Sequence, residues 1–164
     1  MRDLLIGAPV FWVHTNATLM ICIAAALLVW TLSRKWIADK ALLWFDAIGL
    51  AAYATYGAAK ALNYGVAPVP AFAMGVMTAC VGGIIRDVLA GRPSILMRPE
   101  LYVTAAALSS ALCALGAVLD QPRALVWPLA ALAGLALRGS AIQFGLALPA
   151  YRREGTRPTN SAPR

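Results

Sequence analysis

Two adjacent glycines and two opposite charges stand together at the end of a long apolar segment of this sequence. Gly82 and Gly83 lie in a run of uncharged residues, 61–85, and Arg86 and Asp87 follow at once. A run of that length can cross a hydrocarbon core about 30 Å thick. Adjacent glycines weaken a helix, and a charge in the hydrocarbon costs roughly 2.5–3.5 kcal/mol. Such features persist where they line a cavity, so we predict that these four residues form a permeation site.

A second set of charges lies on one face of the preceding predicted helix. Asp46 and Lys60 are fourteen residues apart, so a helix places them within about 40° of each other and roughly 21 Å apart along its axis. Gly49, Tyr53 and Gly57 share that face. In one interpretation the face lines a pore. In the other, Asp46 and Lys60 merely extend to the two membrane interfaces, and the residues alone leave both interpretations open.

Arg138 stands near the centre of the last predicted span, residues 124–149. An arginine at that depth rarely faces lipid, so we expect it to pair inside the bundle or to face water. Its partner is Asp87 or Asp46, and the sequence does not choose between them.

Small residues recur at every fourth position of the segment 71–90 and end in a carboxylate. The series is Ala71, Gly75, Ala79, Gly83 and Asp87. Such a ridge is typical of helices whose backbones approach each other closely. Gly82 beside Gly83 favours a further interpretation, a kinked helix at a conduction site.

Composition indicates an integral membrane protein. Of 164 residues, 61% are hydrophobic and 13% charged, and the mean hydropathy is +0.72. The net charge of +7 comes from basic residues in short segments between spans and in the tail, so we predict no nucleic-acid partner. No Ser/His/Asp set, HExxH motif or phosphate loop is present, and the cysteines are isolated in apolar runs. We therefore predict no enzymatic activity, no catalytic residues, no metal and no cofactor.

Five complete spans are predicted in a transmembrane domain covering residues 1–150. The spans are 17–33, 41–62, 71–90, 100–119 and 124–149. Lys and Arg gather on one side of alternating spans, which places the C-terminus in the cytoplasm. The polar tail, residues 151–164, is predicted to be disordered.

An internal repeat organises these spans. Arg2 and Asp3 begin an eight-residue segment that matches residues 86–93 at five positions. The second copy follows two apolar segments, whereas the first begins at residue 2. From the repeat we therefore expect about forty or more further residues before the first copy. We expect a first three-helix repeat ending near residue 40, a second over 41–119, and a last helix. Three crossings invert each successive copy, which places Arg2-Asp3 outside and Arg86-Asp87 inside.

Three motifs resemble the bacterial branch of the trimeric intracellular cation channel family, also called the glycine transporter domain family. They are Phe45-Asp46-Ala47-Ile48-Gly49, Tyr56-Gly57-Ala58-Ala59-Lys60-Ala61 and Val81-Gly82-Gly83-Ile84-Ile85-Arg86-Asp87-Val88-Leu89-Ala90-Gly91. The resemblance implies an all-α membrane fold of seven helices, two inverted three-helix repeats plus one, here N-terminally truncated. It also implies a homotrimer with a pore in each protomer, where kink glycines matching Gly82 and Gly83 line the constriction. The family often has three glycines here, and this chain has two.

Two transport functions remain open. The first is a passive, potassium-type monovalent cation channel in the bacterial inner membrane, with Asp46 and Asp87 setting the local charge. Lys60 and Arg86 oppose a cation unless paired, so we expect Arg86 to pair with Asp87 or another acid, and Lys60 to act as a gate or an anchor for anionic lipid. The alternative is a carrier of a small zwitterion such as glycine, in which an arginine holds the carboxylate and an aspartate the ammonium.

Overall fold

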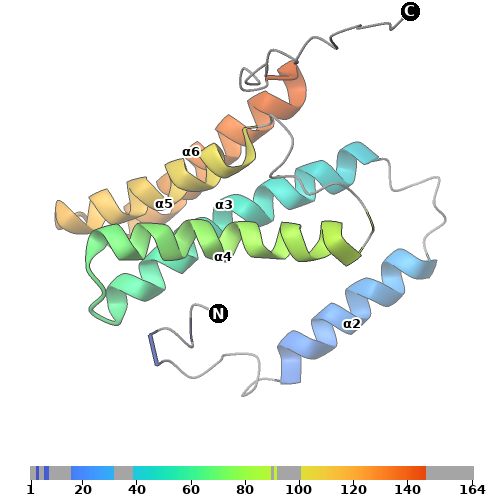
Figure 1. Ribbon diagram of the computed structural model, residues 1–164, viewed down its shortest axis with the longest axis horizontal. Helices are drawn as coiled ribbons and strands as arrows, with labels where there is room; N and C mark the ends of the chain where they lie inside the picture. The colour runs from blue at the N-terminus through green and yellow to red at the C-terminus, as the bar shows by residue number, and fades with distance from the viewer. Residues whose placement is uncertain are drawn as a thin grey trace, which may run out of the picture.

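The computed structural model describes residues 3, 6–7, 16–31, 39–89, 91 and 101–146. Within these residues the chain forms helices and no strand (Figure 1). The helices are α2 (Asn16–Thr31), α3 (Asp39–Asn63), α4 (Pro68–Leu89), α5 (Tyr102–Val118) and α6 (Arg123–Phe144). Arg2 and the predicted tail, 151–164, lie outside the described part of the chain, so these predictions stay predictions.

The helix bounds follow the predicted spans closely except at the end of α6. The prediction extends to residue 149, but the helix ends at Phe144. Gly145 adopts a left-handed conformation with φ 63°, and its backbone N–H donates to the Ala141 carbonyl. A glycine in this conformation is a common helix terminator, because it has no side chain to clash with the backbone.

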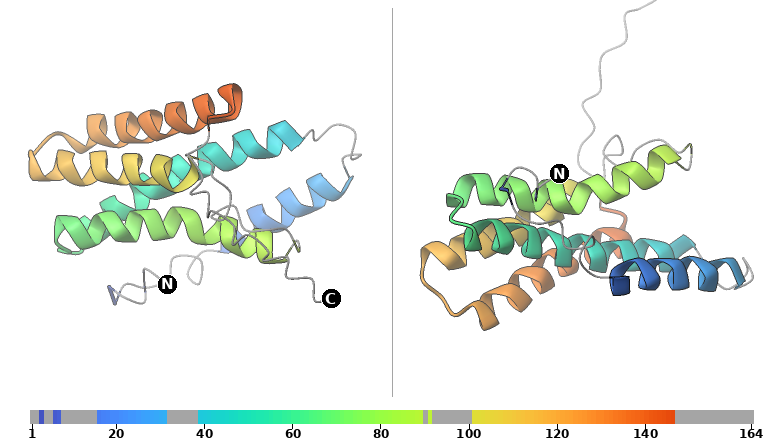
Figure 2. Two further views of the ribbon diagram at one scale, coloured as in Figure 1. Left: turned by 45° about the horizontal axis from the view of Figure 1, so that its top comes forward. Right: turned by 90° about the horizontal axis from the view of Figure 1, so that it is seen from below.

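Helices α3 to α6 form one bundle in which α3 contacts each of the other three. The contacts α4 with α5 and α5 with α6 complete it, and both views in Figure 2 show these helices side by side. Helix α2 makes no comparably extensive contact and lies to one side of the bundle in Figure 1. The core of the bundle is made largely of alanines, which allows the helix axes to approach closely.

The small-residue ridge of α4 packs against the bundle, as predicted. All five members, Ala71, Gly75, Ala79, Gly83 and Asp87, are buried. A side-chain carbon added at Gly75 would lie 2.6 Å from the carbonyl oxygen of Ala54 in α3, a distance that only a glycine permits. The ridge therefore sets the distance between α3 and α4.

Gly82 and Gly83 do not interrupt this helix, and the predicted kink at these two glycines stays a prediction. Helix α4 is continuous from Pro68 to Leu89, and both glycines are helical. Two glycines cost a helix roughly 1–2 kcal/mol in total, which the packing of the ridge can offset.

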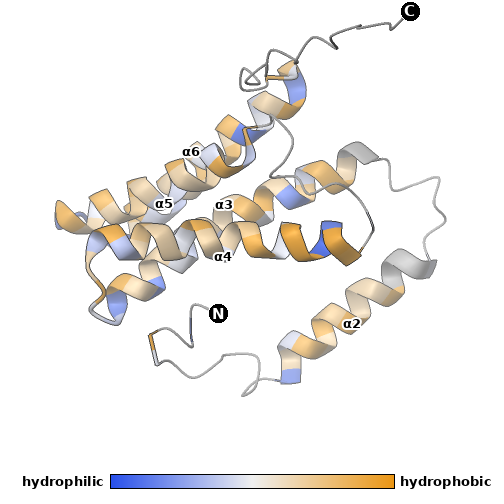
Figure 3. Cartoon of the chain, viewed as in Figure 1, coloured by the Kyte–Doolittle hydropathy of each residue, from blue (hydrophilic) through white to orange (hydrophobic). Residues whose placement is uncertain are grey.

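Helices α4 and α6 are each long and apolar enough to cross a membrane, judged by length and composition. Helix α5 is apolar but shorter, and α2 contains a shorter apolar stretch. Large apolar side chains such as Leu129 and Leu132 are exposed on the outside of the bundle. Figure 3 shows hydrophobic residues along most of each helix, with hydrophilic ones mainly towards the ends. This distribution is that of a membrane-embedded bundle.

Candidate functional site

Arg86 joins α3 to α4 by contacting two carboxylates. Its Nη1 atom donates to Asp46 Oδ1 at 2.6 Å, while Nη2 and Nε donate to Asp87 Oδ1 at 3.0 and 3.1 Å. The Asp46 and Asp87 side chains are only 15% and 9% exposed, and that of Arg86 is 36% exposed. The prediction that Arg86 pairs with an acid is confirmed, and it pairs with two.

The topology explains why these three residues meet. Helices α3 and α4 are joined by a short turn, residues 64–67, and run in opposite directions (Figure 1). The beginning of α3, which carries Asp46, therefore lies beside the end of α4, which carries Arg86. The ridge that ends in Asp87 holds the two helices close enough for one guanidinium to reach both carboxylates.

Lys60 forms a second ion pair near the opposite end of α3. Its Nζ atom lies 3.1 Å from Asp3 Oδ1, and the two side chains are 14% and 9% exposed. The rise of a helix places Lys60 about 21 Å from Asp46 along α3. Asp46 and Lys60 are therefore each paired with another residue, and both interpretations of their face, pore lining and membrane interfaces, stay predictions. Each copy of the repeated motif contributes an aspartate to one of the two clusters.

The residues between Asp46 and Lys60 do not form one lined face. Gly57 is buried against Gly75 and Thr78 of α4, whereas the Tyr53 side chain is 54% exposed. Gly49 has open space where a side chain would stand. The predicted shared face thus divides into a buried part, where α4 crosses α3, and an open part around Gly49.

Arg138 lies inside the bundle, as predicted. It is 2% exposed, and its guanidinium carbon lies 5.3 Å from the centre of the Tyr102 ring. This is the geometry of a cation–π interaction. The structure thus assigns an aromatic neighbour to Arg138, and the predicted choice between Asp87 and Asp46 stays a prediction.

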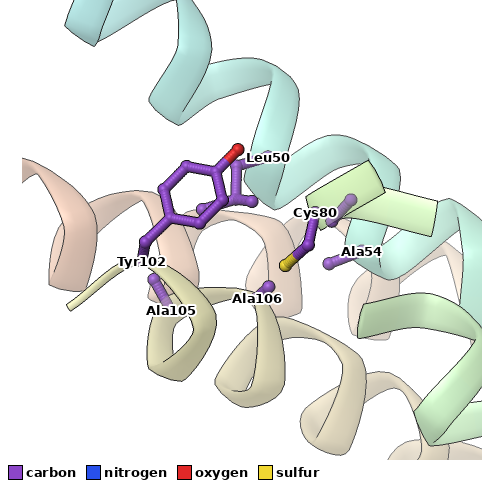
Figure 4. Packing of buried hydrophobic residues seen from close by; sticks show 7 residues of the cluster. Leu50, Ala54, Cys80, Tyr102, Ala105 and Ala106 are labelled. Atoms are coloured by element: carbon purple, nitrogen blue, oxygen red, sulfur yellow. The ribbon is translucent and has the colours of Figure 1, made fainter. Parts of the chain in front are cut away.

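Tyr102 is the central residue that the sequence patterns did not indicate. It is 2% exposed, begins α5, and packs with Leu50, Ala105 and Ala106 (Figure 4). Its hydroxyl oxygen would lie 2.5 Å from a side-chain carbon built on Gly83. The available signal was indirect: a buried ridge of small residues requires a large side chain opposite. Gly83 is therefore a packing position, while Gly82 is exposed with open space around it.

Solved structures similar to this chain identify its family. One is the crystal structure of the trimeric intracellular cation channel orthologue from Rhodobacter sphaeroides, at 38% identity and a TM-score of 0.81. The likeness covers 88% of this chain and 76% of that one. The chain belongs to the trimeric intracellular cation channel family. A second channel structure, solved to explain conductance, matches at 29% identity with a TM-score of 0.82, over 94% of this chain and 77% of that one.

Other proteins similar to this chain are described as membrane proteins. The UPF0126 membrane protein of Vibrio cholerae is 35% identical over 158 residues, which is 92% of this chain. The UPF0126 inner membrane protein YadS of Escherichia coli strain K12 is 38% identical over 112 residues, which is 64% of this chain. The chain spans 64% and 52% of the lengths of these two relatives. The family model described as "Glycine transporter" matches residues 43–117.

Proposed function

We propose that this protein is a passive monovalent cation channel of the potassium type, with a pathway inside each protomer. The observation that carries the proposal is the cluster of Asp46, Arg86 and Asp87, held inside a bundle with an apolar exterior. Charged groups inside a membrane-embedded bundle usually mark an ion pathway. Burying them away from water costs free energy, so they are rarely found there without a function. Support also comes from the similar structures, which are named cation channels.

The charges of the two clusters favour a cation over an anion. The Arg86 cluster presents two carboxylates, those of Asp46 and Asp87, to a passing cation, while Lys60 and Asp3 compensate each other. Arg138 is positive but lies against the Tyr102 ring. We place the pathway along the open faces of Gly49 and Gly82, next to Asp46 and Arg86. Gly83 supports it indirectly, by allowing Tyr102 to pack against α4.

The proposal extends to assembly and location. The similar channels are named as trimeric, and one curated relative is named as an inner membrane protein. We propose a homotrimer in the bacterial inner membrane with a cytoplasmic C-terminus, surrounded by lipid, acting in transport and not in catalysis.

A glycine carrier is the second candidate, because the family model that matches residues 43–117 is described as a glycine transporter. In such a carrier an arginine would bind the substrate carboxylate and an aspartate the ammonium. Arg86 already donates to two carboxylates of the protein. A substrate would have to displace one of them, so the arrangement favours the channel.

Liposome flux separates the two functions. We expect the purified protein, reconstituted with KCl, to release potassium without any added solute, and to show no saturable uptake of glycine. Asp46→Asn is expected to reduce the potassium flux several-fold, because it removes one negative charge beside Arg86. Asp39→Asn is the matched control, since it makes the same substitution at the first residue of α3. Saturable glycine uptake without potassium flux would contradict the channel function and support the carrier function.

A further inference from the structure

A cavity of about 530 Å³ lies at the end of the bundle where α3 and α5 end and α4 and α6 begin. Its volume is within the range of sites that hold small ligands. Ala59, Leu62 and Asn63 of α3 line it, so it lies far along α3 from Asp46. The proposed cation pathway around Arg86 does not use it.

The cavity presents one charge of each sign. Asp120, in the turn between α5 and α6, and Arg123, the first residue of α6, both line it. Neither forms an ion pair with another residue among those that the structure describes. Trp127 lies one turn further along α6 and lines the same cavity. A carboxylate, a guanidinium and an indole are thus available to a ligand.

The backbone at Asp120 has an unusual conformation. Its φ is 50°, in the left-handed region, and it is the one non-glycine residue with positive φ in the described part of the chain. Glycine adopts this conformation without strain, whereas an aspartate does so less readily. The chain therefore retains a carboxylate where the turn alone would favour a glycine.

Apart from Asn63 and Gln121, the remaining wall of the cavity is apolar and continues onto the outside of the bundle. Cys113, Ala117 and Val126 line the cavity, and Val118 lines it while also being exposed. Leu125 is 60% exposed nearby on α6. In a membrane this outer surface contacts acyl chains. The cavity thus has charged residues at the ends of the helices and continues into an apolar surface that faces lipid.

We propose that this cavity binds the headgroup of a zwitterionic phospholipid that carries a primary ammonium group. The phosphate would contact Arg123, and the ammonium would contact Asp120 and the Trp127 ring. The ends of membrane-spanning helices lie at the depth of lipid headgroups, where tryptophan is also favoured. An anionic headgroup without an ammonium would leave Asp120 uncompensated. A free zwitterion would gain nothing from the apolar wall.

Native mass spectrometry of the purified protein tests this site. The protein is delipidated and exposed to vesicles containing equal amounts of phosphatidylethanolamine and phosphatidylglycerol. We expect phosphatidylethanolamine to be retained preferentially. Arg123→Gln and Asp120→Gly are each expected to lower its retention about three- to ten-fold, the range for one partly exposed charged contact. Asp39→Asn, at the other end of α3, is expected to change nothing.

Asp120→Gly separates loss of the site from loss of the fold. Glycine suits the positive φ at position 120, so we expect the variant to unfold at the same or a higher temperature while losing the lipid. Equal retention of phosphatidylglycerol, or unchanged lipid binding in both variants, would overturn the proposal. So would binding of soluble glycerophosphoethanolamine as tight as that of the lipid, since the site would then select a free zwitterion.

Discussion

The guanidinium group of Arg86 holds carboxylates of two different helices, and its shape makes this possible. Arginine presents several N–H donors in a fixed plane, so one group can donate to Asp46 and to Asp87 at the same time. A lysine is a single compact charge and does not reproduce this geometry. At residue 86, both the charge and the planar shape of the side chain are needed to join α3 to α4.

Replacing Arg86 tests this directly. Arg86→Gln is expected to lower the free energy of unfolding by about 1–2 kcal/mol, a value reduced from that of a fully buried pair because the Arg86 side chain is 36% exposed. Arg86→Lys is expected to recover only part of the loss. Denaturation in detergent measures both, and adding Asp46→Asn to Arg86→Gln is expected to restore some stability. Wild-type stability of Arg86→Gln would contradict the bridge.

The adjacent glycines are expected to respond differently to the same substitution. Gly83→Ala places a carbon 2.5 Å from the hydroxyl oxygen of the buried Tyr102, so we expect a loss of about 1–3 kcal/mol. Gly82→Ala meets nothing within 4 Å and is expected to be neutral or to stabilise α4 by up to about 1 kcal/mol. Thermal unfolding of both variants, with Tyr102→Phe added to Gly83→Ala for rescue, measures the difference. Equal losses of stability in the two variants would contradict the assignment of Gly83 alone to packing against Tyr102.

Among the helices, the packing of α4 was predictable from sequence and its continuity was not. Ala71, Gly75 and Ala79 recur every fourth residue, and a helix necessarily places them on one face. Whether Gly82 and Gly83 break the helix depends instead on what packs against them. Only Gly83 has such a neighbour, Tyr102, which comes from another helix nineteen residues away in sequence, while Gly82 has open space around it.

For the two ion clusters, too, one part was predictable from sequence and another part was not. The charges of Asp46, Lys60 and Arg86 were identifiable as unusual, because charged residues are rare in apolar spans. The pairing of Arg86 with its sequence neighbour Asp87 was also predictable, but its pairing with Asp46 and the partner of Lys60 were not, since those contacts depend on how the helices cross. The pairing of Lys60 with Asp3 joins positions 57 residues apart, and no local pattern in the sequence indicates it.

The contact between α3 and α4 depends on Gly75 more than on other glycines of the two helices. Gly75→Ala would place a carbon against the Ser110 hydroxyl and 2.6 Å from the backbone oxygen of Ala54. Because a backbone atom cannot rotate away, we expect a loss of about 2–3 kcal/mol that Ser110→Ala does not fully rescue. Gly49→Ala, with open space around it, is the control in α3. Unfolding in detergent compares them, and a small effect of Gly75→Ala would mean that the helices can separate at little cost.

Across the whole molecule, one ion cluster lies near each end of α3. Arg86 with its two aspartates stands at one end, and Lys60 with Asp3 at the other. Asp3 and Asp87 are matching positions of the repeated motif, so the two copies act near opposite ends of the same helix. This arrangement agrees with inverted repeats around a shared pathway.

The reversal potential of the purified protein in a planar bilayer, with a ten-fold KCl gradient, tests the cation pathway most directly. We expect a wild-type potential close to the potassium equilibrium potential, and a shift towards zero in Asp46→Asn with Asp39→Asn unchanged. The negative charge beside Arg86 attracts potassium and repels chloride, which is the reason for this sign. A wild-type potential near zero or on the chloride side would contradict the proposed cation pathway.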